Sequence, residues 1–244
     1  MISMKSFYAF LSILILCFSI YFTQNLRLDA SSDSLILQND KSFKYFEYYN
    51  KIFPNKNFLI LAIKSNKLID HKYIEKINLI KKKLEKIKNI ESTFSIVDAP
   101  ILLLNNLNLA DLNKENIYTI NDNRNNLNLI LDEFSKSPIF KDQIINDKKT
   151  VTSIIIYLKP NNTFNEIKTE RELINNNIKA TSDEIYNINS KYRAQKKIFN
   201  DERNKLIYEI RSTLKKENLE YKYFLGGIDM IANDTINFVK NDIS

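Results

Sequence analysis

An uncharged and mostly hydrophobic run lies near the amino terminus. Residues 7–22 contain no charge, and a helix rises 1.5 Å per residue, so residues 7–26 together approach the roughly 30 Å core of a bilayer. Lys5 precedes the run, and the positive-inside rule then places the amino terminus in the cytoplasm. The pattern predicts an uncleaved membrane anchor over residues 1–28. A cleaved signal peptide is the alternative.

Small, acidic and hydroxyl-bearing residues follow this run directly, in LRLDASSDSLILQND over residues 26–40. In DASSDS (29–34) the Asp and Ser side chains favour local turn hydrogen bonds at a membrane exit, and ion or substrate binding is the alternative. Asp40 is a good N-cap for a helix over residues 41–53. Residues 29–56 are therefore predicted to be an exit segment and a short helix. Its spaced aromatic residues predict a stripe facing the core: Phe43, Phe46, Tyr49 and Phe53.

Further along, short apolar stretches predict an α+β domain over residues 57–226. Residues 57–64 form a continuous apolar run, which is typical of a strand buried on both faces. Three more strands are predicted, over residues 92–98, 150–160 and 220–227. The strand over residues 150–160 has Ile154, Ile156 and Leu158 on one face. Asp70 caps a long helix between the first two strands, with lysines on its solvated face. The apolar seam of that helix is Tyr73, Ile77, Ile80, Leu84 and Ile87.

The second half of the chain predicts long helices. Residues 101–145 are rich in Asn and predict short helices, whereas the stretch from 161 to 225 has neither Gly nor Pro. Thr181 and Glu184 form a capping box between two helices, which predicts a helical hairpin over about residues 164–218. Apolar residues recur every seven positions along one seam of the second helix, which predicts that the two helices pack on each other along that seam. The alternative is that the seam forms a coiled coil between copies of the chain. The seam residues are Ile185, Tyr192, Phe199 and Leu206, with Ile188 between them.

The predicted order is strand, helix, strand, insertion, strand, helices, strand. This is the split-βαβ, ferredoxin-like arrangement, here elaborated by a long hairpin. Residues 227–244 then predict an amphipathic helix that leads towards a second membrane helix. Its apolar face is Ile228, Ile231, Thr235 and Phe238.

Composition argues against several classes of function. The net charge of +7 comes from dispersed lysines in a chain rich in Asn and Ile, which does not favour nucleic-acid binding. Cys17 is the only cysteine and His71 the only histidine, so no intrachain disulfide and no thiolate metal site can form, and His71 reads as a solvated surface residue. With two glycines and no catalytic motif, we expect no enzyme, no catalytic residue and no cofactor. Substrate-binding residues cannot be assigned.

Several stretches in the same order resemble a known family. They are LRLDASSDSLILQND, KNFLILAIKS, IKNIESTFSIVDAPIL, SIIIYLKP and YFLGGIDMIANDTINFVKNDI. In order and spacing they resemble the first membrane helix and first periplasmic loop of RND-superfamily exporters of the MMPL and hopanoid-transporter-like kind. The resemblance covers nearly the whole chain. In that family the closing helix leads into a second membrane helix.

The resemblance implies a function that the residues alone do not give. The chain would be the N-terminal part of a proton-driven exporter of lipids or other hydrophobic compounds, contributing the first periplasmic porter subdomain at the bacterial inner membrane. Its partners would be the bilayer and the remaining membrane helices and second loop of the transporter, with homo-oligomers as a further expectation. The alternative is a single-pass, membrane-anchored extracytoplasmic domain for binding, sensing or scaffolding.

Overall fold

The computed structural model describes residues 4–23, 41–53, 56–104, 118–122, 126–217 and 220–243. By its internal contacts the chain divides into two units. One comprises residues 38–231 and contains the sheet, and the other comprises residues 1–37 together with 232–244. The DASSDS stretch and Asp40, which the sequence assigns to a turn and a helix cap, lie outside the described residues.

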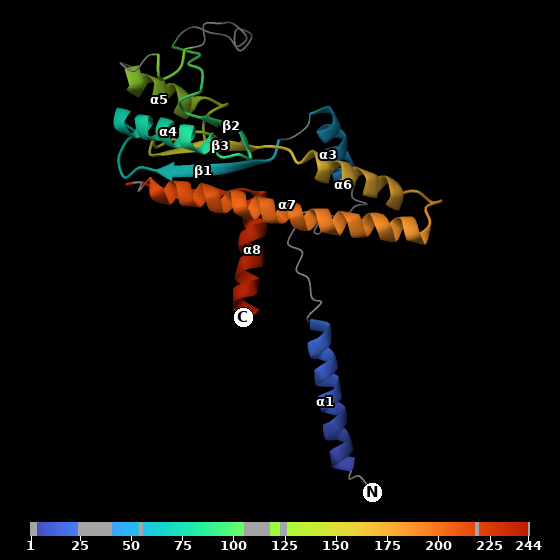
Figure 1. Cartoon of the computed structure of the whole chain (residues 1–244). Coiled ribbons are helices and arrows are strands. Elements are labelled where there is room, and N and C mark those ends of the chain that lie inside the picture. Colours follow the sequence, from blue (N-terminus) through green and yellow to red (C-terminus); the bar gives the residue numbers. More distant parts are fainter. Residues whose placement is uncertain are drawn as a thin grey trace. The chain divides into compact units, whose positions relative to one another are not determined.

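Four strands form one antiparallel sheet in the order β2-β3-β1-β4 (Figure 1). β3 is hydrogen-bonded between β2 and β1, and β1 between β3 and β4, each pair antiparallel. β1 and β2 therefore point the same way with an antiparallel strand between them, and so do β3 and β4. The predicted α+β class is confirmed. The strands are β1 (Phe58–Lys64), β2 (Ile90–Ser95), β3 (Val151–Leu158) and β4 (Lys222–Gly226).

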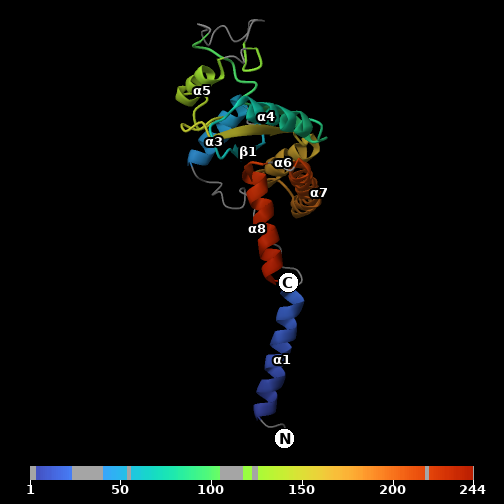
Figure 2. The ribbon, with the colours of Figure 1, turned by 90° about the vertical axis from the view of Figure 1, so that its left-hand side faces the viewer.

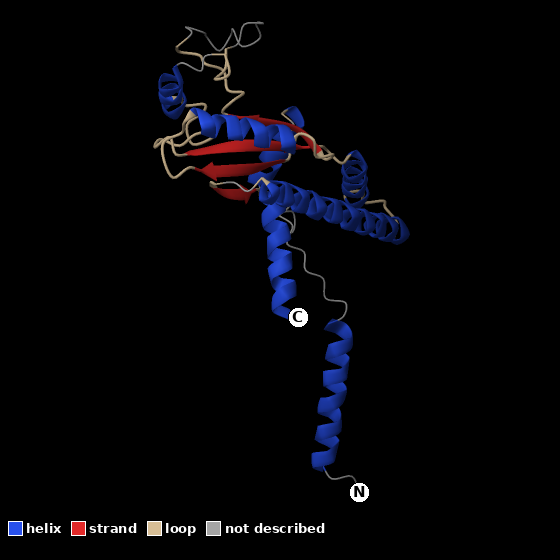
Figure 3. Cartoon of the chain, turned by 60° about the vertical axis from the view of Figure 1, so that its left-hand side comes forward, coloured by secondary structure: helices blue, strands red, loops and turns tan. Residues whose placement is uncertain are grey.

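Helix α4 (His71–Leu84) packs on one face of this sheet, as Figure 3 shows. It begins where the Asp70 side chain accepts a hydrogen bond from the backbone N–H of Tyr73, at 2.9 Å. Its buried seam meets alternate strand residues and the end of α7 (Ser182–Lys216) in one core. The cap is confirmed, and so is the seam from Tyr73 to Leu84. Ile87, the last predicted member of the seam, lies beyond the end of α4 and is half-buried. The core centre comprises Leu59, Leu61, Ile63, Ile77, Ile80, Leu84, Ile154, Ile156, Ile210 and Leu214.

Two apolar stretches are less buried than the sequence predicts. β1 is buried on one face only, because Leu59, Leu61 and Ile63 are covered whereas Phe58 and Ile60 are exposed. The prediction of a strand buried on both faces is wrong, since the helices of the core lie on a single side of the sheet. Likewise, the aromatic stripe predicted on α3 (Lys41–Ile52) and just after it does not face the core, because Phe46, Tyr49 and Phe53 are exposed. The side chain of Phe43 lies outside the described residues.

Two of the lysines predicted to be solvated, Lys76 and Lys81, are half-buried. The others are exposed, as predicted: Lys82, Lys83, Lys86 and Lys88. Lys81 lies between two carboxylates, 2.8 Å from Asp98 and 3.3 Å from Glu85. Lys76 and Lys83 both pair with Glu217, at the end of α7. These ion pairs join α4 to its neighbours, while His71 at the start of α4 is exposed, as predicted.

A helical hairpin extends past the end of the sheet (Figure 1), and Figure 2 shows the same hairpin nearly end-on. α6 (Asn162–Asn175) lies against the first half of α7, and the second half of α7 enters the core. The capping box of Thr181 and Glu184 is present at the start of α7, as predicted. Of the predicted seam, Ile188, Tyr192 and Leu206 are buried, whereas Ile185 is exposed. In the Asn-rich stretch the described helix is α5 (Leu127–Lys136).

The chain begins and ends in helices. Every side chain of α1 (Met4–Thr23) from residue 10 to residue 18 is exposed, Cys17 included. Most of these side chains are large and apolar. α8 (Ile228–Ile243) has the predicted bounds, with Ile228, Ile231 and Phe238 exposed. None of the helices, as far as their residues are described, combines the length and hydropathy needed to cross a membrane. The anchor over residues 1–28 stays a prediction.

Candidate interaction surface

Two hollows in the sheet-containing unit are candidates for binding. One lies beside α5 and the other on the sheet face that α4 does not cover. Within the described ranges, no group of three or more His, Cys, Asp or Glu residues could hold a metal ion.

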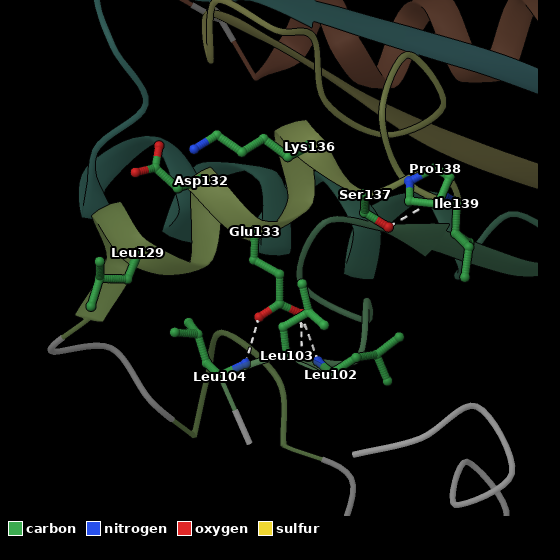
Figure 4. Close-up of a pocket in the computed structure, with 10 residues that line it drawn as sticks. All are labelled: Leu102, Leu103, Leu104, Leu129, Asp132, Glu133, Lys136, Ser137, Pro138 and Ile139. Atoms are coloured by element: carbon green, nitrogen blue, oxygen red, sulfur yellow. Dashed lines mark hydrogen bonds between the residues drawn. The ribbon is translucent and has the colours of Figure 1, made fainter. Parts of the chain in front are cut away.

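The hollow beside α5 has a volume of about 730 Å³ (Figure 4). Leucines from residues 102–104 form one wall, and α5 with the turn after it forms the other. Its charged side chains are Asp132, Glu133 and Lys136. Asp132 pairs with Lys149, which is not part of the lining. Lys136 is the cation among the lining residues, and it is exposed. A volume of this size is within the range of small-molecule pockets.

Glu133 is a buried polar residue in the lining of this hollow, 8% exposed. Its carboxylate accepts hydrogen bonds from three successive backbone N–H groups, from Leu102 at 2.7 Å, Leu103 at 3.0 Å and Leu104 at 2.9 Å. Figure 4 shows the side chain pointing from α5 into this loop. Because its oxygens already have donors, Glu133 fixes the loop to α5 and stabilises the wall of the hollow. The sequence gives no signal for it, since its partners lie about thirty positions away.

The second candidate, which we call the open sheet face, is the side of the sheet opposite α4. Residues that pair across neighbouring strands point to the same side of a sheet. Phe58, Ile60 and Ala62 of β1 pair with Tyr157, Ile155 and Ser153 of β3, and Ala62 also pairs with Phe224 of β4. Phe224 is 62% exposed, Phe58 48% and Ile60 38%. The centre of this face is therefore apolar and uncovered.

A groove of about 560 Å³ runs over the open sheet face. Its floor is the alternate residues of β1 and β3, and residues 142–146 form a wall. That wall is held to β3 by a hydrogen bond of 3.1 Å from the Ser153 N–H to the Ile144 carbonyl. The groove is thus a formed feature of the fold, bounded by backbone on one side.

Charged side chains lie at both ends of this face. Lys56 donates to Glu91 at 2.6 Å, so its charge is already paired. At the other end Lys64 of β1 and Lys222 of β4 are directly opposite each other, and both are exposed. Beyond the backbone pairing of the strands, the side chain of neither lysine makes a hydrogen bond or ion pair with any described residue. Like charges facing each other across two strands are unfavourable.

The hairpin has a different kind of surface, because its aromatic side chains are turned inward. Phe164 of α6 stacks on Tyr192, with ring centroids 5.6 Å apart, and on Phe199, at 4.6 Å. Arg171 lies over the Tyr192 ring at 4.4 Å, and Arg203 over Phe199 at 4.9 Å. These contacts hold α6 against α7 within one chain. Tyr192, at 8% exposed, is not available to a second copy.

No family model matches this chain, and neither does any curated protein or solved structure. The resemblance to exporters therefore stays a prediction from the residues. The open sheet face was missed in the sequence because residues 57–64 read as uniformly apolar. In EYKYFLGG, Lys222 lies on the same strand face as Phe224, and a charged residue on that face is a local signal that the face is uncovered.

Proposed function

We propose that this chain forms the N-terminal, membrane-flanked porter domain of an RND-type, proton-driven exporter of lipids or other hydrophobic compounds. In this account the domain transports nothing by itself. It docks through its open sheet face onto the rest of the transporter, whose membrane helices carry the protons.

The observation that carries the proposal is the open sheet face. Monomeric soluble domains seldom leave a contiguous apolar surface uncovered, and such surfaces mark sites of association. Phe58, Ile60 and Phe224 expose apolar side chains at the centre of a rigid sheet. A domain that works as one wall of a larger assembly needs a surface of this kind.

The connectivity gives further support. The strand order β2-β3-β1-β4, antiparallel throughout, is that of a ferredoxin-like sheet with two interleaved βαβ units. Such a domain was expected from the resemblance. Its strands are preceded by the uncharged run at residues 7–22 and followed, after Gly227, by the amphipathic helix α8. A sheet between two such segments suits a loop domain of a membrane protein.

The proposal requires residues 57–226 to lie outside the cytoplasm. Cys17 is the only cysteine, so a Cys17→Ser/Ile178→Cys variant carries a single thiol at the hairpin tip, where Ile178 is fully exposed. We expect a membrane-impermeant maleimide to label this variant in cells with an intact inner membrane. Cys17→Ser alone is the unlabelled control. Labelling only after permeabilisation would contradict the proposal.

The second candidate is a single-pass anchored domain that binds a small apolar ligand. The hollow of about 730 Å³ beside α5 favours it, since it is walled by leucines and carries an exposed lysine. A scaffold acting through Tyr192 and Phe199 is less well supported. Both rings are engaged by Phe164 in the same hairpin.

A further inference from the structure

We propose that the open sheet face binds an acidic, amphipathic helix of another protein domain. This inference rests on the proposed function, because it names the chemistry of the surface onto which the domain docks. It is carried by three features of the face: an apolar centre, a bounded groove and a pair of lysines at one end.

A helix fits the groove better than a partner with a flat surface does. The opposite side of the sheet is covered by α4 and the end of α7, which pack Ile and Leu side chains into the core. A helix on the second side would complete a three-layer arrangement, which is a common way to cover a sheet. Residues 142–146 wall the groove along β3, and a ridge of apolar side chains can fit beside that wall. A lipid surface could not enter such a hollow as closely.

The lysines determine the charge of the helix. Lys64 and Lys222 are cross-strand neighbours on the open sheet face, which brings their side chains to about 5 Å at Cβ. Two like charges at this spacing repel, and a carboxylate placed between them would relieve the repulsion. Lys64 and Lys222 lie on the same face outside the groove lining, whose own charged residues are Lys56, which pairs with Glu91, and Asp142. Glu220, two positions before Lys222, is exposed and pairs with Lys72. An acidic residue is therefore favoured at the Lys64 end and not along the whole groove.

Complementary charges at the edge of a binding surface chiefly determine specificity and orientation, while the apolar centre supplies the contact area. The lysine pair would thus select acidic helices from other amphipathic ones. It would also fix the direction in which a bound helix lies across β1 and β4. Phe224, two positions after Lys222 and on the same face of β4, would contact the apolar stripe of that helix.

The test measures binding of two designed peptides to the full chain in zwitterionic nanodiscs, with empty discs as the blank. Both are fluorescent amphipathic helices of roughly 18 residues with the same leucine stripe, and the flanking positions are Glu in one and Lys in the other. By fluorescence anisotropy we expect the Glu peptide to bind roughly tenfold more tightly at physiological salt. Equal binding of the two peptides, or none by either, would overturn the proposal.

Matched variants separate this site from the overall positive charge. The Lys64→Glu/Lys222→Glu variant should lose the preference for the acidic peptide. Lys82→Glu/Lys86→Glu changes the net charge equally and alters two exposed lysines on the α4 side, so it should retain the preference. An equal effect of both pairs would contradict a local site. Phe224→Ser should weaken binding of the Glu peptide while an unchanged melting temperature shows that the fold is intact.

The two proposals fail in different ways. If the thiol at position 178 proves cytoplasmic, the exporter proposal is wrong whatever the peptides do. If the thiol is extracytoplasmic and the peptides bind equally, the location stands and the partner chemistry is wrong.

Discussion

Gly227 lies directly against Leu59, at the point where β4 ends and α8 begins. A Cβ atom on Gly227 would come within 2.7 Å of Leu59 Cδ2 and 3.2 Å of the Phe58 carbonyl oxygen. Its φ of +143° is a conformation that residues with side chains rarely adopt. The path from the sheet into the last helix therefore depends on glycine for two independent reasons.

We expect Gly227→Ala to destabilise the domain by about 1–3 kcal/mol, because it adds backbone strain to the contact with Leu59. Gly226→Ala is the matched control, since the nearest atom to its added Cβ would be the Ile60 carbonyl oxygen at 4.0 Å. Urea unfolding followed by circular dichroism compares the two variants with the parent chain. Equal stability of the two alanine variants would show that the Leu59 contact is not restrictive.

Tyr73 gives the core a defined dependence on pH. Its hydroxyl is buried, donates to the Ile63 carbonyl at 2.7 Å and lies 2.8 Å from Thr152 Oγ1. Burial raises the pKa of this hydroxyl from 10.0 to about 12. The unfolded chain therefore releases this proton at lower pH than the folded chain, so the stabilisation is complete below pH 10 and falls as pH rises towards 12.

The expected loss over that interval is about 2–3 kcal/mol. Tyr73→Phe removes this contribution to the pH dependence, although it costs roughly 1–3 kcal/mol at neutral pH by leaving buried partners unpaired. Urea unfolding at pH 8 and at pH 11 measures both effects, and about half of the loss, roughly 1.4 kcal/mol, is expected by pH 11, midway between the two pKa values. If the free energy of unfolding fell equally between these pH values in the parent chain and in Tyr73→Phe, a buried, neutral tyrosine would be contradicted.

Glu133 should control the order of the loop at residues 102–104. Glu133→Ala removes the acceptor of three N–H groups, and we expect those amides to exchange faster and the domain to lose about 1–3 kcal/mol. Asp132→Asn, one position earlier on α5, removes only a partly exposed pair with Lys149 and should cost at most about 1 kcal/mol. Hydrogen exchange resolved by peptide compares the two variants. Unchanged protection of residues 102–104 in Glu133→Ala would refute this role.

The hairpin should loosen without the sheet. Phe164→Ala removes stacking on Tyr192 and Phe199, which we expect to cost about 1–3 kcal/mol within α6 and the first half of α7. Leu173→Ala, on the same helix and 69% exposed, is the control. Hydrogen exchange should rise in the hairpin of Phe164→Ala and stay unchanged in β1 and β3. Equal loss of protection in the sheet would show that hairpin and sheet unfold together.

Features with a local cause could be predicted from the sequence. The Asp70 cap, the Thr181–Glu184 capping box and the seam of α4 each depend on residues a few positions apart, and all three are present. The bounds of β3 and α8 followed from turn residues and spacing for the same reason.

Features set by tertiary contacts could not be predicted in this way. The apolar run of β1 does not reveal that helices cover only one face of the sheet, so the sequence wrongly predicts burial of both faces. The opposition of Lys64 and Lys222 depends on the register of two strands far apart in the chain. Glu133 meets a loop about thirty residues away, and no local pattern announces such a contact.

The central claim is that this domain belongs to a larger transporter. Reading the coding DNA past codon 244 tests it most directly. The account predicts that the reading frame continues, directly or after one frameshift, into several apolar segments of roughly 20 residues and a second domain with βαβ units. A stop codon with no such segments in the neighbouring DNA would contradict the exporter account and leave the anchored binding domain in its place.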